Sequence, residues 1–190
     1  MDWQQLGEAL PLTRNPLTRF IGRGALMALG WRIEGIFPDR SKIVVALIPH
    51  RSNMDFILTI AVLWGLGLKA SFLMKHSLFW FPLGNILTAL GGIAIDRSGP
   101  QGLVGQMTRE FGQRPKMVLG ITPEGTRGGT SEIKQGFAQI AAAAKVPILP
   151  AVLDYRTRTI HFAEIIEETS DADKVVEYIR SMIVTQINGS

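Results

Sequence analysis

A short apolar run, followed by a polar turn and a long apolar segment, is the feature that most constrains the fold of this chain. Residues 43–48 are Ile-Val-Val-Ala-Leu-Ile, a short stretch rich in β-branched residues that predicts a buried strand. Residues 49–55 are polar, and residues 56–68 are almost wholly apolar and long enough for a helix. Residues 49–55 are therefore predicted to be a strand-to-helix turn.

The same alternation of strand and helix runs along the rest of the chain. Further strands are expected at 31–36, 70–74, 93–95, 116–121, 147–153 and 157–162, and further helices at 16–29, 82–90, 100–112, 135–145 and 170–188. Strands that alternate with helices favour a parallel sheet with helices on its faces. We predict a single α/β domain over residues 1–190, built on a mostly parallel mixed sheet flanked by helices.

Composition excludes several classes of protein. The chain has no cysteine, which excludes thiol catalysis and disulfides and fits a reducing compartment. No clean run of about 20 apolar residues indicates a bilayer span, and no signal peptide is visible. The net charge of +4 suits an anionic surface or a small anionic substrate. No dense Lys/Arg tract indicates a nucleic-acid partner.

Residues 14–30 form a predicted helix with two interpretations. Asn15 and Pro16 are typical of a helix start. The helical pattern that follows is made of Leu17, Phe20, Ile21, Ala25, Ala28 and Leu29, punctuated by Arg14, Arg19, Arg23 and Arg32. A basic amphipathic helix of this kind can lie on an anionic membrane, or it can pack on the core with solvated arginines. We adopt a membrane-surface helix as the working prediction.

His50 and Asp55 are the first candidate catalytic residues. On one continuous helix their spacing would turn them roughly 140° apart. If His50 lies in the turn and Ser52 or Asn53 caps the helix, Asp55 falls in the first helical turn and can reach back to the imidazole. A carboxylate bonded to one ring nitrogen leaves the other nitrogen as a base. Taken alone, the spacing also fits a capped helix preceded by a surface histidine.

Two further polar blocks follow predicted strands, at residues 96–98 and 122–129. In open α/β sheets, ligand sites gather outside the carboxyl ends of the strands. Gly125 allows a close backbone approach to a ligand, and Arg127 offers a planar fork suited to phosphate. Ordinary surface turns, or a local ion pair at Asp96 and Arg97, are the simpler explanations of each block taken alone.

Together these blocks resemble the lysophospholipid acyltransferases, the 1-acylglycerol-3-phosphate acyltransferase family. The matching blocks, in order, are His50-x4-Asp55, residues 91–97 ending in Asp-Arg, residues 123–127 (Pro-Glu-Gly-Thr-Arg), and residues 146–148 (Val-Pro-Ile) with Pro150. Lys75 stands where the family usually has a lysine ahead of the second block. Four blocks in order are far more specific than any one alone.

The resemblance implies a glycerolipid acyltransferase-like fold and acyl transfer from a thioester to the free hydroxyl of a lysophospholipid, with 1-acylglycerol-3-phosphate as the expected acceptor. His50 would be the general base, and Asp55 would orient it. The implied substrate-binding residues are Lys75, Arg97, Glu124, Gly125, Thr126 and Arg127.

The implied donor is acyl-CoA or an acyl-carrier protein, and neither a metal nor another cofactor is expected. The expected partners are the lysophospholipid acceptor, the acyl thioester and a membrane surface. We expect a cytoplasmic protein that lies peripherally on the inner face of the cell membrane.

Two other classes remain open at this stage. A metal-dependent hydrolase of a lipid or phosphoester would use His50, Asp55, Asp96 and Glu124 as ligands, but Arg97 and Arg127 would crowd a cation. A non-catalytic lipid-binding membrane protein would keep the basic helix and an apolar pocket, yet it has no need for a His-Asp pair.

Overall fold

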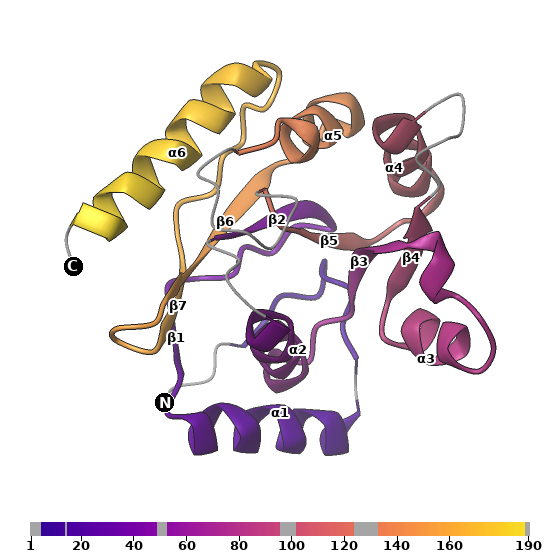
Figure 1. Cartoon of the computed structure of the whole chain (residues 1–190), viewed down its shortest axis with the longest axis vertical. Coiled ribbons are helices and arrows are strands. Elements are labelled where there is room, and N and C mark those ends of the chain that lie inside the picture. Colours follow the sequence, from indigo (N-terminus) through magenta and orange to yellow (C-terminus); the bar gives the residue numbers. More distant parts are fainter. Residues whose placement is uncertain (1–4, 14, 49–52, 96–101, 124–132, 189–190) are drawn as a thin grey trace.

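A seven-stranded sheet with the strand order β1-β7-β6-β2-β5-β3-β4 forms the centre of the computed structural model (Figure 1). The structure describes residues 5–13, 15–48, 53–95, 102–123 and 133–188. The strands are β1 (Arg32–Glu34), β2 (Lys42–Ile48), β3 (Ala70–Lys75), β4 (Gly92–Ile95), β5 (Met117–Ile121), β6 (Ile148–Asp154) and β7 (Thr159–Phe162). From β6 to β4 every neighbouring pair is parallel, whereas β7 runs antiparallel to β6 and β1 runs parallel to β7. The predicted mostly parallel mixed sheet is confirmed.

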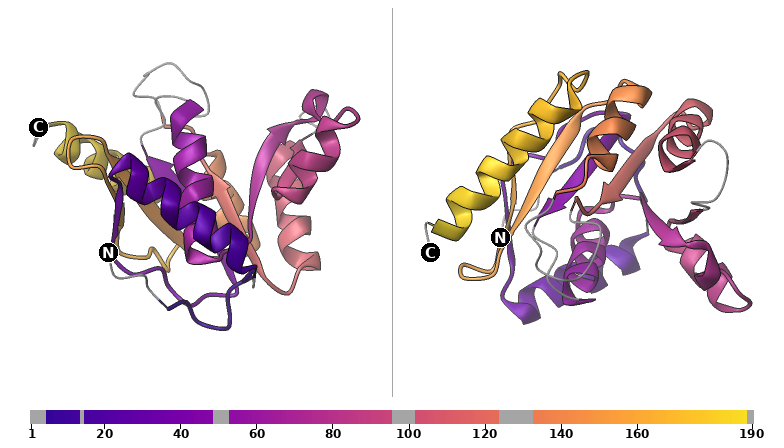
Figure 2. Two further views of the ribbon diagram at one scale, coloured as in Figure 1. Left: turned by 90° about the horizontal axis from the view of Figure 1, so that it is seen from below. Right: turned by 45° about the horizontal axis from the view of Figure 1, so that its top comes forward.

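Helices cover both faces of this sheet (Figures 1 and 2). Helices α1 (Pro16–Leu29) and α2 (Asn53–Leu66) lie on one face, and α4 (Gly102–Gln113), α5 (Gly136–Ala144) and α6 (Ala172–Asn188) lie on the other. The connection from β3 to β4 holds a 3₁₀ turn, η1 (His76–Leu78), and the short helix α3 (Leu83–Ala89).

Strand β2 shows why the core has two halves. Its side chains alternate between the faces because successive residues of a strand point to opposite sides. Ile43, Val45 and Leu47 belong to the cluster built with α1 and α2, and Val44, Ala46 and Ile48 belong to the cluster built with α4, α5 and α6. The continuous apolar run is thus a strand covered on both faces.

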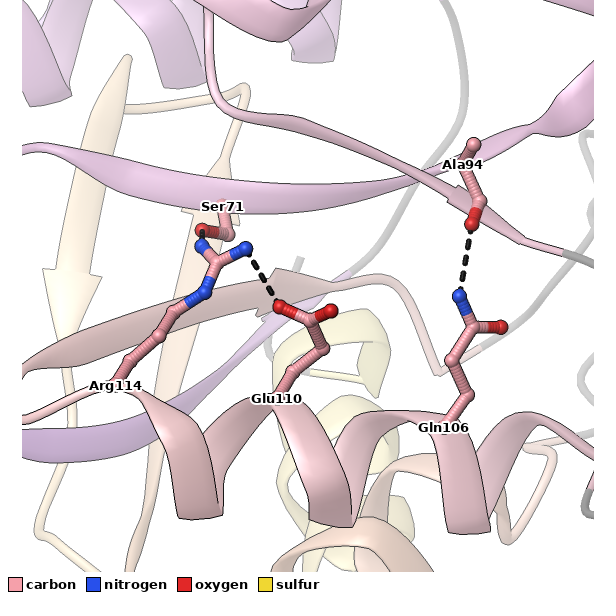
Figure 3. A network of polar contacts seen from close by, with 5 residues as sticks. All are labelled: Ser71, Ala94, Gln106, Glu110 and Arg114. Atoms are coloured by element: carbon pink, nitrogen blue, oxygen red, sulfur yellow. Dashed lines mark hydrogen bonds and ion pairs between the residues drawn. The ribbon is translucent and has the colours of Figure 1, made fainter.

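Helix α4 is fixed to β3 and β4 by side-chain hydrogen bonds (Figure 3). Arg114 donates to the Ser71 hydroxyl at 3.3 Å and pairs with Glu110 at 2.6 Å. Gln106 Nε2 donates to the carbonyl oxygen of Ala94 at 2.9 Å. The last bond holds the carboxyl end of β4, the strand that directly precedes Asp96 and Arg97.

The N-cap of α6 is Asp171, whose carboxylate accepts from the Lys174 amide at 3.1 Å. The two long apolar stretches of the sequence differ in burial. Helix α2 contributes buried residues to the core, whereas no residue of η1 or α3 is buried. Among the described helices, none is both long and apolar enough to cross a membrane.

Candidate active site

The carboxyl ends of five parallel strands meet at one edge of the sheet, in the spatial order β6, β2, β5, β3, β4. Each polar block of the sequence follows one of these strands directly. Residues 49–55 follow β2, residues 122–129 follow its neighbour β5, Lys75 ends β3, and residues 96–98 follow β4. Because adjacent strands are about 4.8 Å apart, the ends of β2 and β4 lie about 14 Å from each other. The blocks therefore begin at one edge of the sheet, within about 14 Å of each other.

Asp55 is the described half of the predicted dyad. It lies in the first turn of α2, as the sequence predicted, and its side chain is 0% exposed. A negative side chain interacts favourably with a helix N-terminus because the amide groups there point outward. A carboxylate cut off from water also needs hydrogen-bond donors, because an uncompensated buried charge is very costly.

Lys75 lies at the same edge but on a different strand. It is the exposed last residue of β3 and pairs in register with Ile95, the last residue of β4. Gly91, just before β4, has φ +92°, and an added Cβ there would lie 2.0 Å from the Ala70 carbonyl oxygen. A glycine is therefore required where the second block begins.

The two ends of the third block are joined to each other. Pro123 is buried, and its carbonyl oxygen accepts from the Lys134 amide at 2.9 Å. Ile133, beside Lys134, is buried in the cluster under α5. The described chain thus ends at Pro123 and resumes at Ile133 close to the same place, beyond the carboxyl end of β5.

Most of the predicted site residues are not described. His50, Arg97, Glu124, Gly125, Thr126 and Arg127 all lie outside the described residues, so their roles stay predictions. In the part of the chain that the structure describes, no three His, Cys, Asp or Glu side chains gather into a group that could hold a metal ion.

Tyr155 is a residue that the sequence analysis did not select. It follows β6 directly, and its hydroxyl donates a hydrogen bond to Oδ1 of Asp55. Its ring also lines a pocket of about 480 Å³ beside the start of α2, together with Ala28, Leu29, Trp31, Met54, Leu58 and Arg158. No local sequence signal marks Tyr155, because its contact with Asp55 depends on β6 lying next to β2.

The arginines of α1 do not lie where a basic outer face would place them. Arg23 Nε donates to the Gly65 carbonyl oxygen at 3.0 Å, and an Arg19 guanidinium nitrogen donates to that of Leu66 at 3.3 Å. Both side chains therefore bind carbonyl groups at the C-terminal end of α2, which lack partners within the helix. These two arginines therefore do not lie on the outer face of α1, which is apolar. The placement of residues 14–30 on a membrane surface stays a prediction.

Comparison with known proteins identifies the family. A model of the Acyltransferase family matches residues 32–154, well over half of the chain. The chain therefore belongs to the Acyltransferase family. This region contains all four sequence blocks, and it ends one residue before Tyr155.

Individual relatives point the same way. The 1-acyl-sn-glycerol-3-phosphate acyltransferase of Cocos nucifera is 31% identical over 111 residues, which cover 55% of this chain and 35% of that protein. A protein of the same name from Saccharomyces cerevisiae is 28% identical over 136 residues, covering 67% of this chain and 44% of that protein. The chain thus spans less than half the length of these two relatives.

A solved structure shares the fold. The crystal structure of the 1-acyl-sn-glycerophosphate (LPA) acyltransferase PlsC from Thermotoga maritima matches with a TM-score of 0.64. The match covers 91% of this chain and 78% of that chain, at 20% sequence identity. At this identity the likeness concerns the fold alone.

Proposed function

We propose that this chain transfers a fatty acyl group from an acyl thioester to the free hydroxyl of a lysophospholipid, with 1-acylglycerol-3-phosphate as the acceptor. One observation carries the proposal: within a chain of the Acyltransferase family, a fully buried aspartate stands in the first turn of the helix that follows His50. Two relatives carry the name of that activity. The burial of Asp55 supports its role as the partner of His50.

In the proposed reaction His50 takes the proton of the acceptor hydroxyl as general base. The hydroxyl oxygen attacks the thioester carbonyl directly, and Asp55 stabilises the imidazolium that forms. The tetrahedral intermediate collapses with cleavage of the carbon–sulfur bond, and the imidazolium returns its proton to the leaving thiolate. No acyl-enzyme and no cofactor are needed. Backbone amides near Gly125 are proposed to stabilise the oxyanion.

The acceptor phosphate is proposed to bind between Arg97 and Arg127, with Lys75 nearby. The strand order supports this arrangement because the Arg127 block leaves β5, the strand next to β2, and Arg97 follows β4 on the far side of Lys75. Glu124 and Thr126 would fix the arginine side chains and the turn. A phosphate held in this way places a glycerol hydroxyl near the imidazole, and this positioning lowers the activation barrier of the reaction.

A membrane surface is the proposed source of the lipid acceptor. Helix α1 exposes Leu17, Phe20, Ile21, Met27 and Leu29, and the segment after β3 exposes Leu78, Trp80, Phe81 and Ile86. Phe20 and Phe81 are 76% and 82% exposed, which is unusual for rings of this size. The C-terminal end of α1 lines the pocket beside Asp55, and Leu78 follows the carboxyl end of β3.

The C-terminal end of α1 and the segment after β3 therefore adjoin the edge of the sheet at which the polar blocks begin. This placement supports a peripheral protein whose site opens toward the lipid. The inner face of the cell membrane remains our proposal for its location.

A product assay tests this function. The protein is incubated with a panel of lysophospholipids and with monoacylglycerol, each with acyl-CoA or an acyl-carrier protein, and products are identified by mass. We expect a diacyl phospholipid, formed fastest from 1-acylglycerol-3-phosphate and undiminished after EDTA treatment. Release of free fatty acid that stops with EDTA and recovers with added metal would instead establish a metallohydrolase. No turnover of any acceptor would indicate a lipid-binding protein.

A further inference from the structure

We propose that Tyr155 is a positioning residue, which holds the Asp55 carboxylate in the orientation that the His50–Asp55 pair requires; this rests on the proposed function. The Tyr155 hydroxyl donates to Asp55 Oδ1 across a separation of 100 residues in sequence. The donor comes from the connection between β6 and β7, and the acceptor comes from the first turn of α2. The bond thus ties the end of β6 to the helix that follows β2.

The burial of Asp55 explains why such a donor is needed. Its side chain is 0% exposed, so water does not solvate the carboxylate. Thr59 donates at 2.7 Å to the main-chain oxygen of Asp55 rather than to the side chain. A carboxylate has two acceptor oxygens, so a bond from Tyr155 to Oδ1 is compatible with a second bond to the His50 imidazole. Hydrogen bonds to an ionised group are the stronger kind and fix its orientation.

The tyrosine ring is itself held in place. It packs edge to face on Trp31, with ring centroids 5.3 Å apart and an interplanar angle of 89°. Trp31 is buried and precedes β1, so the ring rests on the rigid part of the fold. Aromatic pairs in this geometry are favourable beyond the area they bury. The contact with Trp31 therefore fixes the position of the Tyr155 hydroxyl relative to Asp55.

Three further charged groups lie near this pair among the described residues. Arg158 lines the same pocket and donates to the Leu29 carbonyl oxygen at 3.4 Å. Burial raises the pKa of Asp154, but hydrogen bonds from Thr157 and Arg156 outweigh this effect and hold that pKa below its usual range. Arg156 lies on the same turn. The acceptor phosphate is the same in every assay, so a shift of the pH profile between two variants reports on His50 and Asp55.

Replacing Tyr155 with phenylalanine tests the proposal because it keeps the ring and removes only the donor. We expect Tyr155→Phe to lower kcat by about tenfold, the effect of one hydrogen bond to a charged group, with little change in KM. We also expect the acid limb of the pH–kcat profile to move up by about one pH unit. Without the donor, the carboxylate attracts protons more strongly, so the imidazole becomes an effective base only at higher pH.

Tyr178 provides a matched control because it is the other tyrosine of the chain and is exposed on α6. Tyr178→Phe should change neither kcat nor the profile. A second test places Tyr155→Phe in an Asp55→Asn background, where it should cost no further kcat if Tyr155 acts through Asp55.

The possible outcomes distinguish failure of the positioning role from failure of the proposed function. Acyl transfer with an unshifted profile, or a loss of rate equal at every pH, would overturn the positioning role alone. A wild-type protein that transfers no acyl group would overturn the proposed function and this role with it.

Discussion

At the scale of single residues, Asp55 shows how the fold prepares a charged group for chemistry. It is removed from water, lies at the N-terminus of α2, and accepts a hydrogen bond from Tyr155. The helix N-terminus and the Tyr155 hydrogen bond orient the carboxylate before any substrate binds. A pre-oriented group loses little free energy to reorganisation during the reaction, which is why such sites are built on rigid elements.

Arg127 gives a test of the proposed phosphate site. Charge-assisted hydrogen bonds contribute about 1.5–3 kcal/mol each, so Arg127→Ala should lower kcat/KM for 1-acylglycerol-3-phosphate by about ten- to a hundredfold. Arg127→Lys should recover little, because a point charge does not reproduce the guanidinium fork. Monoacylglycerol should be a poor acceptor that is insensitive to either change. Steady-state kinetics with both acceptors checks this.

The control is Arg180→Ala, at an exposed arginine on α6, which should affect neither acceptor. An equal loss for phosphorylated and unphosphorylated acceptors in Arg127→Ala would make Arg127 a structural residue, and the phosphate assignment would be withdrawn.

The sequence was sufficient to predict the position of Asp55 but not the role of Tyr155. The spacing of His50 and Asp55 placed Asp55 in the first turn of a helix, because caps and helix starts are local features. Tyr155 could not be predicted, because its contact with Asp55 depends on the order of strands in the sheet. The sequence pattern specifies each strand but not its neighbours.

At the scale of elements, α1 and α2 approach each other closely. Gly22 of α1 faces the backbone of α2, where an added Cβ would lie 2.4 Å from the Gly65 nitrogen and 2.6 Å from the Ala61 oxygen. Backbone atoms of a packed helix do not yield as a flexible side chain does. The same approach brings the Arg19 and Arg23 side chains to the last carbonyls of α2.

Gly22 and Gly24 therefore form a matched pair for measuring this contact. Gly22→Ala should lower the free energy of unfolding by about 1–3 kcal/mol through overpacking. An added Cβ at Gly24 meets nothing within 4 Å, so Gly24→Ala should raise the free energy of unfolding by about 0.5–1 kcal/mol through helix propensity. Urea unfolding of both variants provides the measurement. If both changes were stabilising, α1 would not pack on α2 as described.

The elements themselves were largely predictable, but the direction that some of them face was not. β-branched runs identified the strands, and apolar spacing identified the helices. The apolar stripe of α1 fitted either a core or a membrane face, because lipid and protein interior are equally apolar. The residues after β3 are equally apolar, yet none in η1 or α3 is buried.

At the scale of the whole molecule, the polar blocks, the C-terminal end of α1 and the exposed apolar segment after β3 adjoin one edge of the sheet. Figure 2 shows α1 lying along the outside of the molecule, across α2. A protein that takes its acceptor from a bilayer benefits from this placement, because the lipid headgroup then reaches the site while its acyl chain stays among apolar groups.

Phe20 provides the test of membrane docking. Phe20→Glu should weaken binding to anionic phospholipid vesicles by about tenfold or more, because a ring that would be buried in lipid is replaced by a charge. Binding by the wild type should persist at high salt, since burial of apolar groups is not screened. Sedimentation with vesicles measures both effects.

The comparison variant is Ile36→Glu. Ile36 is 75% exposed and follows β1, which runs opposite to β2, so it lies at the other edge of the sheet. The Ile36→Glu variant should bind vesicles as the native protein does. Equal vesicle binding by the native protein, Phe20→Glu and Ile36→Glu would show that α1 does not lie on the membrane surface.

The most direct test of the account is the initial rate of acyl transfer from a thioester to 1-acylglycerol-3-phosphate, compared between the native protein and a folded His50→Ala variant. The account predicts a loss of about a hundredfold or more, the usual scale for removing a general base. His161→Ala, at an exposed histidine on β7, should retain the native rate. A folded His50→Ala variant that transfers acyl groups as fast as the native protein would contradict the mechanism.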